Sequence, residues 1–448
     1  MDTPICDFVA DYVRSGRVRL HMPGHKGKPF LGMEPWDITE IPGADSLYEA
    51  EGIIRRSQEN ASVLFGCPTY YSAEGSSQCI RAMVFLAAQY AGSRGRRPLI
   101  LAARNAHKTF LTAVAVLNVP VRWLYPEREE AYLACPVTPE DLERELTNGE
   151  LPIAVYLTSP DYLGNQANIA ALAAVCRKHD VLLLVDNAHG AYLRFLPESA
   201  HPMDLGADLC CDSAHKTLPV VTGGAYLHIS PQVPKEMEEN ALRALALFGS
   251  TSPSYLILQS LDRANAYLDG DYRQRLAAFL PRVDQLKEKL RGLGYELVGT
   301  EPLKITLAPK SRGWRGTELG AELARRGLVC EFADPDFLVL MLTPELPEKT
   351  LEAVAAALEE IPARTPIGER PPRVIPGEPA MTPAEAIRSP WETLPIENCL
   401  GRILASPSVG CPPAVPIGVC GERLGRQALD CFAYYGIREC TVVAETKK

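Results

Sequence analysis

Two short apolar runs, each followed by polar side chains, constrain this chain more than any other feature of its sequence. Residues 181–185 are Val-Leu-Leu-Leu-Val and lead directly into Asp186, and residues 208–211 are followed by Asp212-Ser213-Ala214-His215-Lys216. Short apolar runs of this kind are typical of buried strands. Ligands of open α/β sheets bind at the carboxyl ends of the strands. We therefore expect a carboxylate, a hydroxyl, an imidazole and an amine to gather at one sheet edge.

A lysine beside a serine and a histidine, with an aspartate at a nearby strand end, suits an enzyme that uses pyridoxal 5'-phosphate (PLP). Lys216 would hold the cofactor covalently, and Asp186 would pair with the pyridinium nitrogen and keep it protonated. Each residue also has a structural alternative. A lysine after a strand is commonly solvated, and an aspartate there commonly caps a turn or helix. The combination favours the cofactor site.

Other motifs lie in order along nearly all of the chain, and together they are more specific than any one of them. They are His21-Met22-Pro23-Gly24-His25-Lys26-Gly27, Asp37-Ile38-Thr39-Glu40, Arg104-Asn105-Ala106-His107-Lys108, Ser250-Thr251-Ser252-Pro253-Ser254-Tyr255, Gly401-Arg402-Ile403 and Cys411-Pro412-Pro413-Ala414-Val415-Pro416. With the Asp186 and Lys216 segments, they resemble the Orn/Lys/Arg decarboxylase family of PLP enzymes. The chain is similar to the compact form of that family, which lacks an N-terminal wing domain.

This resemblance implies the aspartate-aminotransferase-like fold, PLP fold type I. The fold class is α/β, with a mostly parallel sheet in the large domain, a small α+β domain and a C-terminal appendage. Patterning along the chain suggests matching boundaries. We expect an N-terminal arm at residues 1–55, a large PLP-binding domain at 56–285, a small domain at 286–361, a proline-rich linker at 362–380 and a C-terminal decarboxylase domain at 381–448.

Strands and helices alternate through the expected large domain, and this alternation predicts a mostly parallel sheet. Strands are expected at residues 98–103, 121–125, 153–158, 181–185, 208–211 and 225–229, and helices at 77–90, 108–117 and 169–179. A helix-rich stretch is expected at residues 254–293. Four segments after it predict the order strand, helix, strand, helix, which indicates a small second domain.

The phosphate of the cofactor requires its own binding elements. Gly75-Ser76-Ser77 opens a predicted helix, and small residues with first-turn amides and hydroxyls bind phosphate there. Serine also commonly caps helices, which is the structural alternative. Ser213 and His215 flank the lysine and could donate to the phosphate too. Glu74 departs from the uncharged residue that is usual at its position.

The resemblance implies further roles around the cofactor. His189 would reach the ring 3-oxygen, although a buried core histidine is the alternative. His107 would lie flat against the ring, with a helix cap as its alternative. Thr251 and Ser252 would come from the neighbouring subunit and contact the phosphate. The active unit would then be a homodimer, or a multiple of dimers, with shared active sites.

The substrate would be a basic amino acid that loses CO2 to give the corresponding diamine or polyamine. Arginine is the first choice, then lysine and ornithine. Asp37, Glu40, Asp45 and Glu49 could bind its cationic end, or could form a solvated acidic arm. Another fold-type-I reaction, such as that of an aminotransferase or lyase, remains open. A non-catalytic regulatory relative also remains open, since the chain departs from the common pattern at three positions: Glu74, Asn187 and Tyr192.

Composition narrows the remaining possibilities. The net charge of −9 argues against nucleic acid as a partner. No apolar run approaches the length of a membrane helix, and the first residues do not form a signal peptide, which favours a cytoplasmic location. Thirteen cysteines occur without a CxxC pair, which favours reduced thiols. Five lie near the end with spacings unsuited to zinc, so we expect buried apolar residues and no metal: Cys399, Cys411, Cys420, Cys431 and Cys440.

Overall fold

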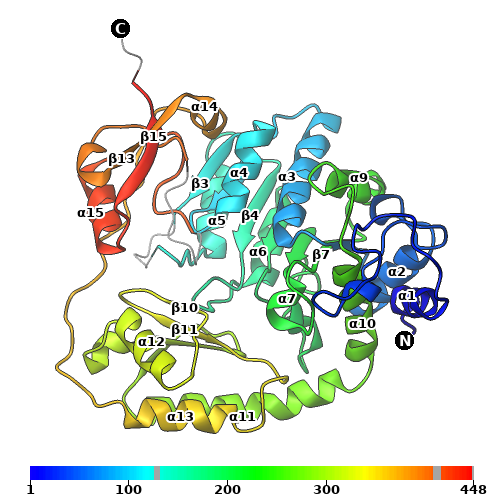
Figure 1. Cartoon of the computed structure of the whole chain (residues 1–448). Helices are drawn as coiled ribbons and strands as arrows, with labels where there is room; N and C mark the ends of the chain where they lie inside the picture. The colour runs from blue at the N-terminus through cyan, green and yellow to red at the C-terminus, as the bar shows by residue number, and fades with distance from the viewer. Residues whose placement is uncertain (126–131, 407–414, 446–448) are drawn as a thin grey trace. The chain divides into compact units, whose positions relative to one another are not determined.

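The computed structural model describes residues 1–125, 132–406 and 415–445. The chain forms two compact units, each built from two segments. The first contains Met1–Arg96 and Ile169–Ala277, and the second contains Arg97–Asn168 and Ala278–Lys448. Figure 1 labels many of their helices and strands. No helix in these described ranges is long and apolar enough to span a membrane.

The first unit is built on four adjacent strands in the order β1-β7-β6-β5. They are β1 (Thr69–Ser72), β7 (Ala225–Ile229), β6 (Leu209–Asp212) and β5 (Leu182–Asp186). Strands β5 and β6 are parallel, and their register pairs Asp186 with Cys211. Strand β7 runs antiparallel to both of its neighbours. The carboxyl ends of β5 and β6 therefore meet at one edge, as the sequence predicts.

The helices of the first unit cover these strands. Helix α3 contacts all four of them and buries a continuous apolar side that includes Ile80, Met83 and Leu86. Helix α2 ends at Gly66, whose positive φ of 73° suits a left-handed cap. The helices are α1 (Pro4–Arg14), α2 (Ile53–Phe65), α3 (Ser76–Ser93), α6 (Ile169–Lys178), α7 (Ala214–Thr217), α8 (Lys235–Glu239), α9 (Ala241–Ala246) and α10 (Tyr255–Asp269). Helix α11 (Tyr272–Gly292) then leads into the second unit.

The second unit holds three parallel strands and a separate antiparallel sheet. The parallel strands are β4 (Ala154–Thr158), β2 (Ile100–Ala103) and β3 (Val121–Leu124), in that order. Helix α4 (Lys108–Leu117) follows β2, and α5 (Pro139–Thr147) follows β3 and begins with a capping box from Thr138 and Asp141. The second sheet has the order β10-β11-β9-β8. Its elements are β8 (Glu296–Val298), β9 (Lys304–Ala308), α12 (Gly316–Arg325), β10 (Phe332–Ala333), β11 (Leu338–Met341) and α13 (Thr350–Glu360).

The C-terminal part of the second unit contains two short antiparallel pairs. They consist of β12 (Glu378–Pro379) with β14 (Glu422–Arg423) and β13 (Trp391–Pro395) with β15 (Glu439–Val443), beside α14 (Pro383–Arg388) and α15 (Arg426–Tyr434). Cys399, Cys431 and Cys440 belong to one apolar core, and Cys420 is also buried. The prediction that these cysteines are buried apolar residues is confirmed for these four. Cys411 lies outside the described residues.

Asp334 is a buried carboxylate in the loop between β10 and β11. Its Oδ1 accepts hydrogen bonds from the backbone N–H groups of Asp336 and Phe337, each at 2.7 Å. Its Oδ2 has no hydrogen-bond partner in the part of the chain that the structure describes. Burial is the largest effect on this group and raises the pKa of Asp334 to about 6. The folded protein therefore holds the proton more tightly than the unfolded chain does.

This raised pKa predicts that Asp334 weakens the fold as the pH rises. Its stabilising contribution is present below about pH 4 and is lost as the pH rises through about 6. A pKa change from 3.8 to about 6 corresponds to at most about 3 kcal/mol, with about half lost between pH 5 and pH 8. We expect Asp334→Asn to raise the melting temperature more at pH 8 than at pH 5. Equal changes at both pH values, as expected for the exposed control Asp284→Asn, would contradict this account.

Candidate active site

Lys216 lies in α7, a single helical turn that directly follows β6. Its Nζ is 3.1 Å from Nε2 of His189, which lies in the turn after β5. The chain segments that carry them are joined by the parallel pairing of β5 and β6. Two predicted site residues that are far apart in sequence therefore share a hydrogen bond. An amine and an imidazole at this distance can exchange a proton.

Asp186 is the last residue of β5, and only 2% of it is exposed. Its Oδ1 accepts hydrogen bonds from the Ala188 backbone N–H at 3.2 Å and from the Cys211 thiol at 3.6 Å. A carboxylate buried to this extent is costly unless a cation compensates it. The position therefore fits the protonated nitrogen of a pyridinium ring.

The first turn of α3 has the features of a phosphate site. Gly75 precedes the helix with a positive φ of 70°, which favours glycine. Ser213 donates a hydrogen bond from its Oγ to Oγ of Ser76 at 2.8 Å, so hydroxyls from two distant segments meet at this helix end. Gly75, the N-cap residue of α3, has no side chain that could cap the helix. Ser77 follows in the same turn, and the backbone N–H groups of such a turn attract an anion.

Glu74, which is unexpected beside a phosphate, is held by a neighbouring loop. Its carboxylate accepts a hydrogen bond from the Ser250 backbone N–H at 2.7 Å, and its own N–H donates to Ser72 Oγ at 3.1 Å. The loop that carries Thr251 and Ser252 therefore begins beside the Gly75 turn of the same chain. The bond gives the Glu74 carboxylate a partner other than a phosphate.

The two remaining predicted histidines have defined hydrogen bonds. His107, in the second unit, caps α4, because its Nδ1 accepts from the Thr109 backbone N–H at 3.2 Å. The cap fixes the ring orientation and leaves the proton of a neutral ring on Nε2. In the first unit, His215 donates from Nδ1 to the Gly224 carbonyl at 3.0 Å. Burial, the largest effect, lowers the pKa of His215, so the neutral ring is favoured.

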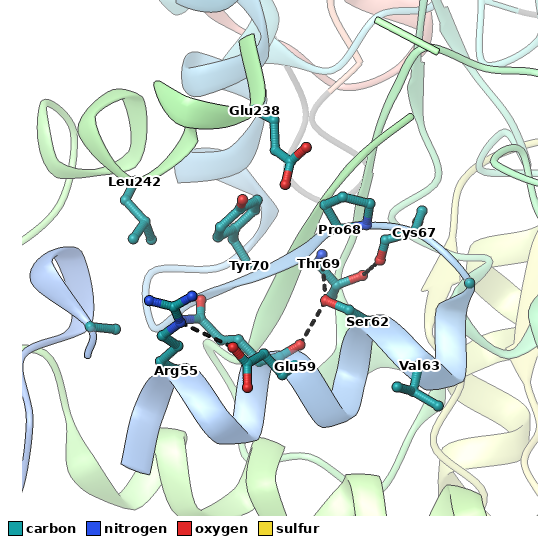
Figure 2. Close-up of a pocket in the computed structure, with 13 residues that line it drawn as sticks. Arg55, Glu59, Ser62, Val63, Cys67, Pro68, Thr69, Tyr70, Glu238 and Leu242 are labelled. Atoms are coloured by element: carbon teal, nitrogen blue, oxygen red, sulfur yellow. Dashed lines mark hydrogen bonds and ion pairs between the residues drawn. The ribbon is translucent and has the colours of Figure 1, made fainter. Parts of the chain in front are cut away.

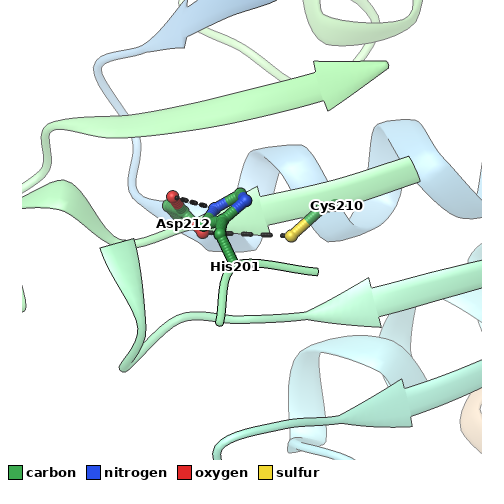
Figure 3. A group of neighbouring side chains, drawn as sticks. All are labelled: His201, Cys210 and Asp212. Atoms are coloured by element: carbon green, nitrogen blue, oxygen red, sulfur yellow. Dashed lines mark hydrogen bonds and ion pairs between the residues drawn. The ribbon is translucent and has the colours of Figure 1, made fainter. Parts of the chain in front are cut away.

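A buried cluster beneath this edge was missed by the sequence analysis. Asp212, the last residue of β6, binds the imidazoles of His228 and, as Figure 3 shows, of His201. The ligand atoms of His201, Cys210 and Asp212 also lie close enough together to hold a metal ion. The only signal in the sequence is an aspartate at the end of an apolar strand. Neither histidine lies near Asp212 in a recognisable motif.

The first unit also has an open cavity of about 660 Å³ between α2, β1 and α8 (Figure 2). Arg55 and Glu59 form an ion pair at 3.0 Å on its α2 side, and Tyr70 and Glu238 lie opposite. None of the predicted site residues lines this cavity. It is therefore separate from the group around Lys216.

Comparisons with known proteins agree with this geometry. Residues 3–300 match the profile of the Orn/Lys/Arg decarboxylase major domain, and residues 373–440 match that of its C-terminal domain. The chain is 28% identical to the uncharacterized protein YaaO of Bacillus subtilis, over 96% of this chain and 93% of that protein. It is 27% identical to an arginine decarboxylase of the same organism, over 94% and 91% of the two chains.

Solved structures show the same fold at low identity. The constitutive lysine decarboxylase of E. coli superimposes with a TM-score of 0.77 and 18% identity, covering 99% of this chain and 82% of that one. Serine palmitoyltransferase of Sphingomonas wittichii gives 0.56 and 16%, over 80% and 83%. The expected PLP fold type I is confirmed. The profile matches extend over most of the sequence, and the chain therefore belongs to the Orn/Lys/Arg decarboxylase family.

Proposed function

We propose that this protein is a PLP-dependent decarboxylase that converts a basic amino acid to the corresponding diamine or polyamine and CO2. The observation that carries the proposal is the hydrogen bond between Lys216 and His189 beside the buried carboxylate of Asp186. Arginine is the preferred substrate, with lysine and ornithine next. Curated relatives named arginine decarboxylase, at 27% identity, support this order over the lysine decarboxylase LdcA of Pseudomonas aeruginosa, at 23%.

The residues present fit PLP. Lys216 would hold the cofactor covalently, Asp186 would pair with the ring nitrogen, His189 would reach the ring 3-oxygen, and His107 would lie against the ring face. The phosphate would be bound by small and hydroxyl residues: Gly75, Ser76, Ser77, Ser213 and, from the neighbouring subunit, Thr251 and Ser252. His215 would join them only with a protonated ring, because its Nδ1 already donates to Gly224 and Nε2 must carry a proton to donate to the phosphate. When bound, PLP supplies an electron sink for the pair that is left as CO2 departs.

The protein itself would control protons and orientation. Asp186 would keep the ring nitrogen protonated, because a buried carboxylate favours a cation beside it. Lys216 Nζ and His189 Nε2, 3.1 Å apart, form the pair from which a proton would return to Cα of the substrate. The hydrogen bond from the Thr109 backbone N–H already orients the His107 ring, so cofactor binding would require no further ordering of that ring.

The acidic arm offers two carboxylates for the cationic end of the substrate. Asp45 accepts hydrogen bonds from the backbone N–H groups of Glu51, Gly52 and Ile54 at 2.8–3.0 Å, so it supports the start of α2. Asp37 pairs with His25 at 3.1 Å. The exposed carboxylates of Glu40 and Glu49 are therefore the better candidates.

The acidic arm also contacts the first turn of α3, where the phosphate site is proposed. Tyr48, the neighbour of Glu49, accepts a hydrogen bond at its hydroxyl from Gln78 Nε2 at 2.7 Å, and Gln78 lies in the first turn of α3. The carboxylate of Glu49 therefore belongs to a segment that contacts this helix end. A planar guanidinium could be bound there through two hydrogen bonds, which favours arginine over lysine.

The reaction can be tested with purified PLP-loaded protein and carboxyl-labelled arginine, lysine and ornithine. We expect labelled CO2 from at least one of them, with arginine fastest, and none from Lys216→Ala. The fold alone is also compatible with an aminotransferase or a lyase. A regulatory relative would neither release CO2 nor transaminate an amino acid. A protein that released no CO2 from any of the three, yet transaminated a neutral amino acid, would show that the proposed reaction is wrong.

Lys216 should be the residue that carries the cofactor, because its amine lies at the edge where β5 and β6 end. Borohydride reduction of the PLP-loaded protein should fix the cofactor covalently, and peptide mapping should place it on Lys216. Lys108→Ala is a suitable control, since that lysine follows His107 but begins a helix in the second unit. A label on Lys108 or Lys26 would contradict the assignment.

Neutralising the carboxylate that binds the substrate should chiefly affect substrate binding. We expect either Glu40→Gln or Glu49→Gln to raise KM for arginine roughly 10- to 100-fold, since a hydrogen bond to a charged group contributes about 1.5–3 kcal/mol. Asp45→Asn should instead lower the melting temperature, because its carboxylate binds backbone N–H groups. Wild-type KM values in both glutamine variants would exclude this arm as the substrate site.

We propose that the active unit is a homodimer, or a multiple of dimers, with shared sites. The N-terminal arm, residues 1–55, exposes several large apolar side chains, as expected of a surface that another subunit covers. They are Val18, Leu20, Met22, Phe30, Leu31, Met33 and Trp36. The Ser250 loop begins beside the Gly75 turn of its own chain, so the proposal requires the two phosphate sites to lie close to the subunit boundary.

Complementation between inactive variants can test the shared site. Lys216→Ala and Ser252→Asp each inactivate one part of it, so mixed dimers should contain one intact site. Random mixing should recover about a quarter of the wild-type activity. Mixing Lys216→Ala with Asp186→Asn is the control, since both residues come from one subunit and no recovery is expected. Equal recovery in both mixtures, or none in verified mixed dimers, would count against a shared site.

A further inference from the structure

We propose that Asp212 is a positioning residue that sets the geometry of the cofactor site through Asn187. Asp212 is the last residue of β6, and Asn187 follows the end of the neighbouring strand β5. Neither residue touches the proposed reacting atoms. Asn187 directly follows Asp186 and lies two residues before His189. The inference rests on the proposed function, because it concerns how this chain arranges its residues toward PLP.

Asp212 is fully buried and both of its oxygens are used. Oδ2 accepts hydrogen bonds from Nε2 of His201 at 3.0 Å and from Nε2 of His228 at 3.1 Å. Oδ1 accepts from the Asn187 amide Nδ2 at 2.7 Å. The two imidazoles come from the loop after residue 195 and from β7, as Figure 3 shows for His201. Three separate segments therefore converge on one carboxylate.

The carboxylate is ionised. The Nδ1 atom of His201 accepts a hydrogen bond from the Met203 backbone N–H at 3.3 Å. The proton of a neutral His201 ring is therefore on Nε2, where it points at Asp212. Burial would raise the pKa of Asp212, but the charges and hydrogen bonds of His201 and His228 outweigh it and hold that pKa below its usual value. A charged acceptor makes a stronger hydrogen bond than a neutral one, which strengthens its hold on Asn187.

Asn187 has little freedom to move. Its backbone N–H donates to the Cys211 carbonyl at 3.0 Å, and its own carbonyl accepts from the Gly190 N–H at 2.7 Å. A Cβ added to Gly190 would lie 2.0 Å from Oδ1 of Asn187, so only glycine leaves room for this amide. The side chain is therefore confined between Asp212 and Gly190. Fixing it also fixes the turn that presents Asp186 and His189.

A bound metal ion is the alternative for this cluster, since His201, Cys210 and Asp212 have suitable spacing. Two observations favour the hydrogen-bond network instead. His201 Nε2 already directs its proton at Asp212, and the other oxygen of Asp212 already accepts from the Asn187 amide. Metal binding would require the imidazole proton to leave a fully buried site and would compete with these hydrogen bonds.

A double-mutant cycle tests the pair directly. Asn187→Asp places a second carboxylate against Asp212, and we expect it to weaken PLP binding at pH 8 at least tenfold and to shift the visible absorption of the lysine-bound cofactor. Adding Asp212→Asn restores a donor opposite an acceptor. The double variant should recover most of the PLP affinity and the wild-type spectrum. Asp212→Asn alone should have a smaller effect than Asn187→Asp, because it brings no second carboxylate into the site.

Asp262→Asn is the matched control. This aspartate is also buried in the first unit, where it accepts from the Ile5 and Cys6 N–H groups and from Ser57 Oγ. Its substitution should lower the melting temperature and leave the cofactor spectrum unchanged. If Asn187→Asp does not fold, Asn187→Ala replaces it in the cycle, with loss of PLP affinity expected and no recovery from Asp212→Asn.

Three results would overturn the proposal. They are wild-type PLP affinity and spectrum in folded Asn187→Asp, no improvement on adding Asp212→Asn, and one equivalent of tightly bound zinc that His201→Ala removes. Failure of the proposed function has a different signature. A protein that uses PLP for another reaction would release no CO2 from basic amino acids, while the cycle would still report PLP affinity and spectrum. A protein that does not use PLP would not be labelled at Lys216 by borohydride, and the cycle would show no cofactor signal in any variant.

Discussion

The parallel pairing of β5 and β6 is the constraint on which the rest of the site depends. It sets Asp186 opposite Cys211, and the chain then leaves both strands in the same direction. The turn after β5 and the helical turn after β6 are therefore neighbours. The distance of 3.1 Å between His189 and Lys216 follows from that register. A shift of one residue in the pairing would turn Asp186 to the other face of the sheet.

This edge buries two carboxylates with different partners. Asp212 is stabilised within the protein by hydrogen bonds from imidazole N–H groups and an amide. Asp186 accepts from a backbone N–H and a thiol, and the proposed function adds the protonated ring nitrogen of the cofactor. Asp212 is thus a supporting residue, whereas Asp186 would face the ligand.

Local patterns made much of the fold predictable. The expected helix at residues 108–117 and strand at 225–229 agree with α4 and β7, because their apolar runs have clear ends. The antiparallel direction of β7 was not predictable, since period and composition do not encode direction. Helix α5 was missed although Thr138 and Asp141 form its capping box. Leu142 and Leu146 give this helix an apolar side, but its other residues are mostly polar, so the segment resembles a surface loop.

The candidate site was predictable where its residues follow strands or open helices. Lys216, Asp186 and Ser76 are such residues, and the structure brings Lys216 and Ser213 to the same edge as His189 and Ser76. Asp212 was not found, because its partners His201 and His228 are distant in sequence and sit in no motif. The partner of Glu74 was equally hidden, since a backbone N–H 176 residues away has no side-chain signature.

The bond between Glu74 and Ser250 has a consequence for how a pair of subunits would behave. It links the turn that opens α3 to the loop proposed to reach across to the neighbouring subunit. Any shift of the Gly75 turn when an anion binds would pull on that loop, and so on the other subunit's site. Occupancy of the two sites would then be thermodynamically coupled, and the coupling would be reciprocal. A single glutamate, out of place in a phosphate loop, would thus make cofactor loading cooperative.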